Sequence, residues 1–146
     1  MTLAGCPIHW VSKLQTEIAL STTESEYIAL SQSFRDLIPM RRMLSALLVG
    51  TNIESSSSVI INSTVWEDNN CAISTAHAKH TSPRTKHIAI KYHFVRSHIL
   101  SVDNSGSADG GIQLKKIESR VQKADIFKKG LPGPDFARIR LLLCGW

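Results

Sequence analysis

The feature that most constrains the fold of this chain is a long apolar stripe in its first half. The stripe residues recur at spacings of three, four and seven: Tyr27, Leu30, Phe34, Leu37, Leu44 and Leu48. These spacings place them on one face of an α-helix, so we expect a long amphipathic helix beginning near residue 21. Pro39 lies inside the stripe and is expected to kink or split this helix. Gly50 is expected to end it.

The segments around this helix alternate between strand-like and helix-like patterns. β-Branched and aromatic residues predict a strand at 7–15, a buried strand or hairpin at 58–68, and an alternating strand at 112–119. Shorter helices are expected at 69–80, 82–100, 120–131 and 135–143. In the second of these, one stripe contains Ile88, Tyr92, Val95 and Ile99. Segments 51–58 and 101–111 have the composition of loops. The order β-α-β-α-α-β-α-α predicts an α/β fold in which helices cover a sheet.

Length and composition indicate an ordinary globular protein. With 146 residues, 42% hydrophobic and 20% charged, one domain over 1–146 is expected. The net charge of +5 favours an acidic partner, nucleic acid first. Three widely separated cysteines form no CxxC pair, which favours a reducing compartment. No leader-like segment and no apolar run of membrane-spanning length occurs, so neither secretion nor membrane insertion is expected.

The start of the long helix contains two glutamates with different expected roles. Ser21 and Glu24 have the spacing of a capping box, and Thr23 and Glu26 form a competing one. Two residues span about 200° of a helix, so the two glutamates face opposite ways. Glu26 lies on the border of the apolar stripe, so it is the better candidate for an inward-facing site. Glu24 is expected to cap the helix and to be exposed.

Three carboxylates occupy comparable places at the ends of elements. Glu26 lies in the first turns of the long helix, Asp68 ends an apolar strand, and Asp125 lies in a short helix after the last strand. Carboxylates that converge from separate elements form a hard-oxygen site of the kind that Mg²⁺ prefers. Two such ions can activate a water and stabilise the leaving oxygen of a phosphodiester. Spacing alone leaves a structural role open for each acid: a helix-start charge, a turn aspartate or a solvated helix face.

Four motifs occur in a fixed order along the chain: "STTESEYIALS", "EDNNCAI", "RTKHIAIKYHFVR" and "KADIFKKGL". Together they resemble the ribonuclease H domain at the end of the Pol polyprotein of copia-type LTR retrotransposons. The resemblance runs from about Thr2 to Leu143. It implies a ribonuclease H-like fold, a five-stranded mixed sheet flanked by helices. It also implies metal-dependent cleavage of the RNA strand in an RNA–DNA hybrid during reverse transcription.

The resemblance assigns roles to individual residues of this chain. Glu26 before Tyr27, Asp68 before Asn69, and Asp125 after Ala124 match the catalytic, metal-binding acids of the family motifs. The implied cofactor is Mg²⁺ or Mn²⁺, two ions in the complete site. The implied partners are an RNA–DNA hybrid and the reverse transcriptase domain of the same polyprotein. The implied location is a retroelement particle in the cytoplasm, or the nucleus.

One departure from the family pattern affects the expected activity. The first metal aspartate of the family lies on a central strand upstream of these motifs, and no aspartate precedes Asp36 in this chain. We therefore expect an incomplete domain that lacks the central strand, with exposed strand edges, and a poor nuclease when isolated. Two alternatives remain: an inactive remnant that still binds nucleic acid, and a purely structural remnant. The motifs do not match the pattern of an integrase or transposase core.

Basic residues near the third motif are candidates for nucleic-acid binding. They lie along the helix expected at 82–100: Arg84, Lys86, Lys91 and Arg96. Cations in such a row would contact phosphates and position a duplex without reading its sequence. An A-form-like hybrid would be recognised by its shape and its 2′-hydroxyls. A solvated helix face without a ligand is the alternative.

Overall fold

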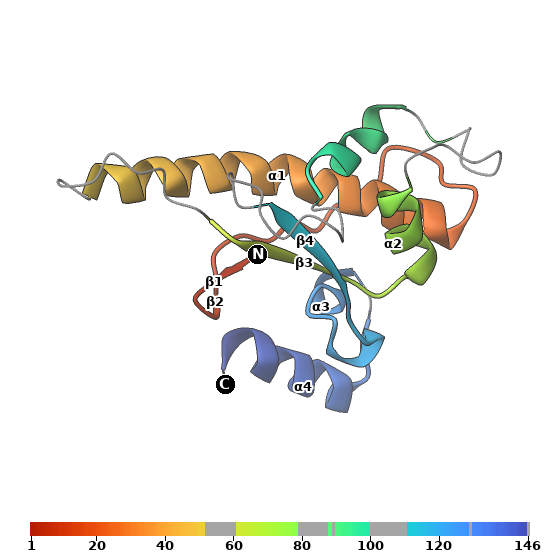
Figure 1. Ribbon diagram of the computed structural model, residues 1–146. Coiled ribbons are helices and arrows are strands. Elements are labelled where there is room, and N and C mark those ends of the chain that lie inside the picture. The colour runs from red at the N-terminus through yellow and green to blue at the C-terminus, as the bar shows by residue number, and fades with distance from the viewer. Residues whose placement is uncertain (52–60, 79–87, 89, 100–110, 129, 146) are drawn as a thin grey trace. The chain divides into compact units, whose positions relative to one another are not determined.

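The chain divides into two compact units. A computed structural model describes residues 1–51, 61–78, 88, 90–99, 111–128 and 130–145 (Figure 1). One unit combines Met1–Ile18 with Ile117–Trp146, and the other is Ala19–Lys116. The second unit contains the long helix, the parallel strand pair and the buried apolar cluster.

The predicted long helix is present as α1, Thr22–Thr51. Ser21 precedes it, and its Oγ accepts the backbone N–H of Glu24 at 3.1 Å, as expected for an N-terminal cap. Pro39 lies within the helix and does not split it, so that part of the expectation is wrong; a kink at Pro39 stays a prediction. Gly50 is also not the end, because the helix continues to Thr51. The predicted apolar stripe is buried at its N-terminal half, where Tyr27 and Phe34 have no exposed surface.

Two parallel strands form the sheet of this unit. β3, Ser63–Glu67, pairs with β4, Ile112–Lys116, in a register that joins Ser63 to Ile112 and Glu67 to Lys116. Ile112 also forms a parallel bridge with Ile99. Both strands lie within segments that the sequence predicts as strands. Because β4 and β3 are parallel, their C-terminal ends meet at one edge of the sheet, where Asp68 and Lys116 lie.

Three helices pack around this sheet. They are α1, the helix α2 at Asn70–His77, and η2 at Ile90–Ser97. The predicted stripe of the segment 82–100 is confirmed, because all four of its members are buried: Ile88, Tyr92, Val95 and Ile99. Its helical part is a 3₁₀-helix rather than an α-helix. The partly buried Val65 and Leu114 pack against the same apolar cluster, which therefore fills one face of the sheet.

The other unit is built from short elements. β1, Thr2–Leu3, and β2, Cys6–Pro7, form an antiparallel hairpin. Its turn residues Ala4 and Gly5 have φ angles of 50° and 83°, a conformation that glycine adopts without steric cost. The C-terminal part contains η3 at Ser119–Val121, α3 at Asp125–Lys128 and α4 at Gly133–Cys144.

The predicted strand at 7–15 is wrong. Only Pro7 of this segment belongs to a strand, and residues 8–15 have no regular structure. Trp10 is 63% exposed and Leu14 is 93% exposed. An alternating pattern forms a strand when one face is buried against neighbours, and these side chains have no such face.

The observed architecture is a mixed α/β arrangement of helices and small sheets. Among the described residues, the strands form two separate two-stranded sheets. The five-stranded sheet implied by the family resemblance is not seen in this part of the chain. Within the same residues, no helix combines the length and the apolar character needed to cross a membrane.

Candidate metal centre

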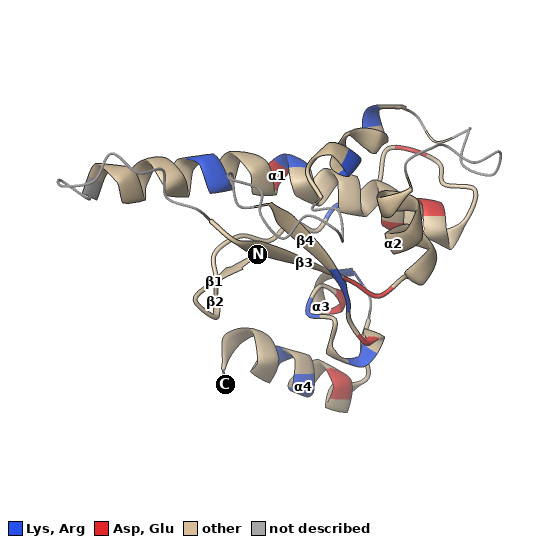
Figure 2. Ribbon diagram, in the orientation of Figure 1, with Lys and Arg blue, Asp and Glu red and all other residues tan. Residues whose placement is uncertain are grey.

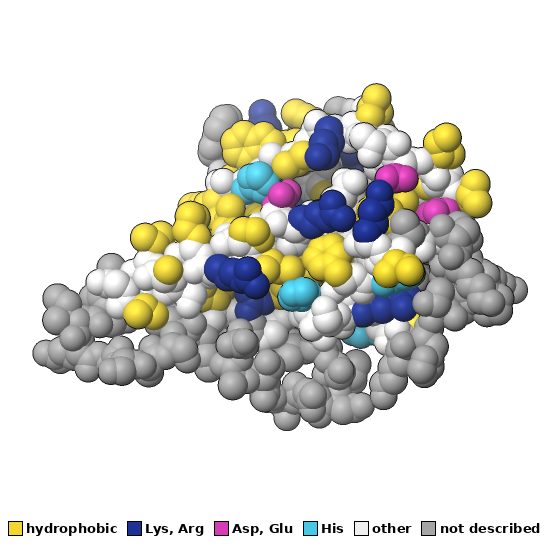
Figure 3. Space-filling view, turned by 90° about the horizontal axis from the view of Figure 1, so that it is seen from above, with side chains coloured by type: hydrophobic (Ala, Val, Ile, Leu, Met, Phe, Trp, Pro, Cys, Tyr) yellow, Lys and Arg dark blue, Asp and Glu magenta, His cyan; other side chains and the backbone are white. Residues whose placement is uncertain are grey.

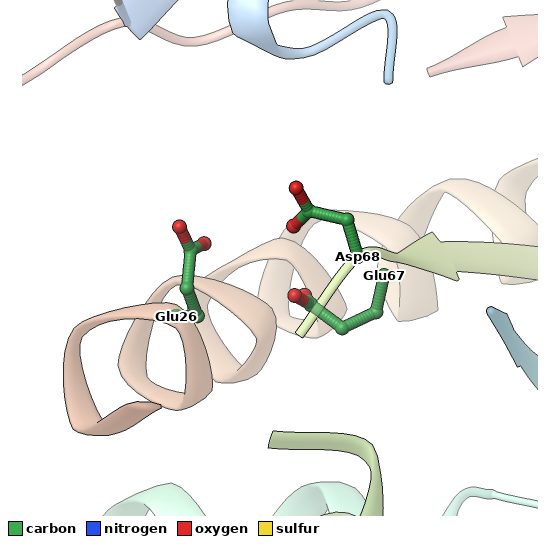
Figure 4. A group of neighbouring side chains, drawn as sticks. All are labelled: Glu26, Glu67 and Asp68. Atoms are coloured by element: carbon green, nitrogen blue, oxygen red, sulfur yellow. The ribbon is translucent and has the colours of Figure 1, made fainter. Parts of the chain in front are cut away.

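Three carboxylates converge at the C-terminal end of β3. Glu26 of α1, Glu67 at the last position of β3 and Asp68 directly after it each offer an oxygen within 4.8 Å of the others. Figure 4 shows the three side chains gathered around one space, Glu26 from the helix and the other two from the strand end. Glu67 is buried, whereas Glu26 and Asp68 are half-buried. The structure thus brings together two of the predicted acids and adds Glu67.

Local hydrogen bonds hold the strand end that carries two of these acids. Oε1 of Glu67 accepts the backbone N–H of Asn69 at 3.0 Å. Oδ1 of Asn69 in turn accepts the N–H groups of Cys71 and Ala72 at 2.9 and 3.1 Å, and so caps α2. Nζ of Lys116 donates to the backbone carbonyl of Asp68. Glu67 of β3 and Lys116 of β4 therefore both hold the segment that follows β3, and this fixes the position of Asp68.

The electrostatics of the cluster favour a bound cation. Two full negative charges within 4.8 Å of each other repel by at least roughly 3 kcal/mol at an effective dielectric constant of about 20. A divalent cation between the three carboxylates would replace this repulsion by attraction. Oxygen donors from carboxylates are also the ligands that Mg²⁺ and Mn²⁺ accept. The residues present therefore fit a hard divalent ion.

Glu24 has the predicted capping role but not the predicted exposure. Its Oε2 accepts the backbone N–H of Leu20 at 2.7 Å, while its own N–H donates to Ser21. Ser21 and Glu24 therefore cap the start of α1 together, with the carboxylate on the N–H of Leu20 rather than on that of Ser21. The expectation of an exposed Glu24 is wrong, since only 6% of this residue is accessible. The reason is the backward reach to Leu20, which draws the carboxylate in against the preceding chain.

Asp125 lies in the other compact unit, at the first position of α3. It is buried, and its Oδ1 lies 3.3 Å from Nζ of Lys128 one turn later. An acid in the first turn of a helix is also favoured by the helix dipole. Its approach to Glu26 and Asp68 stays a prediction.

The four predicted phosphate-binding cations have different surroundings. Arg84 and Lys86 lie outside the described residues. Lys91 is exposed on η2, and its Nζ lies 5.0 Å from the centroid of the Tyr92 ring. Arg96 is turned partly inward, since its Nε and Nη2 are shielded from solvent and donate to no partner in the described part of the chain. Arg96 is half-buried, and its contact with a phosphate stays a prediction.

A partly buried polar contact joins the residue after Glu26 to η2. The hydroxyl of Tyr27 is 3.0 Å from Nδ1 of His93, and the two rings lie 5.6 Å apart. Burial raises the pKa of Tyr27, and the nearby charge of Arg96 partly offsets this. Burial lowers the pKa of His93, and the same charge of Arg96 lowers it further. His93 is therefore held neutral and joins η2 to the helix that carries Glu26.

Glu67 is the acid that sequence reasoning missed. Side chains alternate between the two faces of a strand, which would send Glu67 and Asp68 to opposite sides. The strand ends at Glu67, so Asp68 is released from this alternation and both carboxylates reach the same space. The available signal was the pair of adjacent acids at the end of an apolar strand.

The fold and the cluster describe an α/β protein with carboxylates grouped at a strand end, as in centres that bind a divalent cation. The homologues of the chain are retrovirus-related Pol polyproteins from plant transposons, which indicates a retroelement-derived protein. The chain is 32% identical over 135 residues to the Retrovirus-related Pol polyprotein from transposon TNT 1-94 of Nicotiana tabacum. This match covers 92% of the chain and 9% of that protein.

Two further relatives come from Arabidopsis thaliana. The Pol polyproteins from transposons RE2 and RE1 are 30% and 29% identical, each over 126 residues, or 86% of the chain. The chain spans 8% and 7% of their lengths. No protein-family model matches the chain. No solved structure matches it either.

Proposed function

We propose that this chain is ribonuclease H sequence from a retroelement Pol polyprotein, and that its acidic cluster binds Mg²⁺ or Mn²⁺ for cleavage of RNA in an RNA–DNA hybrid. The observation that carries the proposal is the convergence of Glu26, Glu67 and Asp68 within 4.8 Å. The similarity to Pol polyproteins supports it, because reverse transcription produces such hybrids. The reverse transcriptase domain of the same polyprotein is the proposed protein partner.

The protein groups in this proposal have separate tasks. Glu26 and Asp68 hold the metal from the helix and from the strand end. Glu67 contributes a third oxygen while its hydrogen bond to Asn69 fixes the strand end. When bound, the metal would polarise the scissile phosphate and lower the pKa of an attacking water. Asp125 is proposed as a further ligand on the strength of the motif resemblance.

The test is cleavage of a labelled RNA–DNA hybrid by the purified chain. We expect RNA cleavage that requires Mg²⁺ or Mn²⁺. Asp68→Asn should abolish the cleavage. Asp36→Asn is the matched control, because Asp36 is an exposed acid on α1 outside the cluster. Cleavage that persists in EDTA, or that Asp68→Asn leaves intact, would contradict the proposal.

A further inference from the structure

The two flanks of α1 differ in charge. Arg35 lies nine positions after Glu26, a rotation of about 900° along the helix, so the two residues are on opposite sides. Arg42 lies seven positions after Arg35, a rotation of about 700°, so these two share a flank. Both arginines are exposed. Figure 2 shows blue segments on α1 beyond its acidic start.

The helix η2 lies against the arginine flank and extends it. The guanidinium carbon of Arg35 lies 5.8 Å from the centroid of the Phe94 ring. The ring of His98 meets the same Phe94 edge-on, also at 5.8 Å. A guanidinium beside an aromatic ring gains a cation–π attraction without using its N–H donors in a hydrogen bond. Lys91 adds an exposed ammonium on η2.

Little acidic charge neutralises this flank. Neither Arg35 nor Arg42 has an ion pair with any residue the structure describes. Asp36 is the one acid of α1 after Glu26, and η2 contains none. In the view of Figure 3, Lys and Arg side chains lie beside exposed hydrophobic and histidine side chains. Arg35 and Arg42 therefore offer two guanidinium charges to an anionic partner.

We infer that Arg35, Arg42 and Lys91, here called the basic strip, bind the phosphate backbone of a nucleic acid, separately from the acidic cluster. Arg35 and Arg42 are about 10 Å apart along the helix, the length of about three phosphates on one strand. Guanidinium groups also match phosphate oxygens in a bidentate geometry. A row of cations along one helix fits a linear polyanion, whereas an anionic bilayer would be met by a broad patch.

This inference goes beyond the proposed cleavage and changes which residues are predicted to contact phosphate. Arg96, expected from the sequence to contact phosphate, is turned toward Tyr27 and His93. Arg35 and Arg42 join the predicted contacts, although they lie on a different helix. The binding needs no metal, so it can be measured in EDTA and apart from any nuclease activity.

The test is binding of a fluorescent RNA–DNA hybrid to the full chain in EDTA over a range of salt concentrations. Each phosphate contact that is lost should reduce the slope of log affinity against log salt by about 0.9. The variant Arg35→Gln with Arg42→Gln should therefore lose nearly two units of slope, and Lys91→Gln nearly one. Circular dichroism checks that each variant is folded.

Lys115→Gln is the matched control. Lys115 is exposed on β4, next to Leu114, which packs against the core, so it lies on the opposite face of the sheet from α1 and η2. It should keep the wild-type slope. An unchanged slope in the arginine variant, an equal loss in Lys115→Gln, or tighter binding to phosphatidylserine vesicles than to the hybrid would overturn the inference. Because this binding is measured in EDTA, where no metal-dependent cleavage occurs, a failure of the cleavage proposal would be seen separately.

Discussion

The hydroxyl of Tyr27 lies 3.0 Å from Nδ1 of His93, and this contact links the residue after Glu26 to the helix η2. Tyr27 has no exposed surface. Tyr27→Phe would remove the hydroxyl and leave Nδ1 of the half-buried His93 without this partner, which costs about 1 kcal/mol, toward the low end of the range for a fully buried group. We expect this loss in the free energy of unfolding measured with urea. Ser33→Ala, which removes a hydroxyl bound to the Leu30 carbonyl of its own helix, is the control. Equal stability of Tyr27→Phe and wild type would show that the contact contributes nothing.

The same contact predicts a pH dependence of stability. The pKa of His93 in the fold is below its ordinary value of 6.5 because burial and Arg96 oppose its charge. Below pH 6.5 the unfolded chain takes up a proton that the folded chain resists, so the unfolded state binds more protons. The contribution of His93 is therefore complete above pH 6.5 and is lost as pH falls toward its lowered pKa. Urea unfolding at pH 7.5 and pH 5.5 measures it.

His93→Gln separates this effect from other titrating groups. Glutamine can accept a hydrogen bond from Tyr27 but does not titrate in this range. The variant should lose less stability between the two pH values than the wild type. If both proteins lose the same amount, another group causes the dependence.

The two glutamates at the start of α1 should respond differently to substitution. Glu24→Ala removes the acceptor for the Leu20 N–H and should lower the free energy of unfolding by about 1 kcal/mol. It should leave metal binding unchanged. Glu26→Gln should weaken metal binding and leave the free energy of unfolding nearly unchanged, because it removes a charge from the acidic cluster but no capping hydrogen bond. Loss of metal binding in Glu24→Ala with retention in Glu26→Gln would exchange the two roles.

Exposed apolar surface predicts loose folding of the isolated chain. Trp66 is 49% exposed on a parallel strand, and Leu47 is 59% exposed near the end of α1. Parallel sheets are normally covered on both faces, and such surface promotes association. We expect a broad thermal transition, aggregation and binding of a hydrophobic dye. A sharp cooperative melt of a monomer without dye binding would contradict this.

The sequence predicted the parts of the fold that depend on local pattern. The stripe from Tyr27 and the Ser21 cap located α1, and the apolar run before Asp68 located β3. The prediction of a strand at 7–15 was wrong because alternating apolar and polar residues also occur in exposed segments. The local sequence does not show whether a neighbouring strand is present to pair with the segment. Pro39 lies inside α1. The apolar stripe continues on both sides of it and so favoured a single helix, whereas the missing N–H of proline opposed one.

The candidate site was predictable only in part. Glu26 was selected by helix geometry and motif, and Asp68 by its place after a strand. Glu67 was missed because strict alternation places it away from Asp68, and the exact end of a strand is not visible in sequence. The buried position of Glu24 depends on a backward hydrogen bond to Leu20. The roles of Arg35 and Arg96 depend on how η2 packs on α1, which is tertiary information.

The central claim is that Glu26, Glu67 and Asp68 form a metal centre, and calorimetric titration of the chain with Mn²⁺ tests it most directly. We predict saturable binding by the wild type and by Asp36→Asn, loss of binding in Asp68→Asn and Glu26→Gln, and weakened binding in Glu67→Gln. Identical isotherms for the wild type and Asp68→Asn, or no saturable binding by the wild type, would contradict the claim.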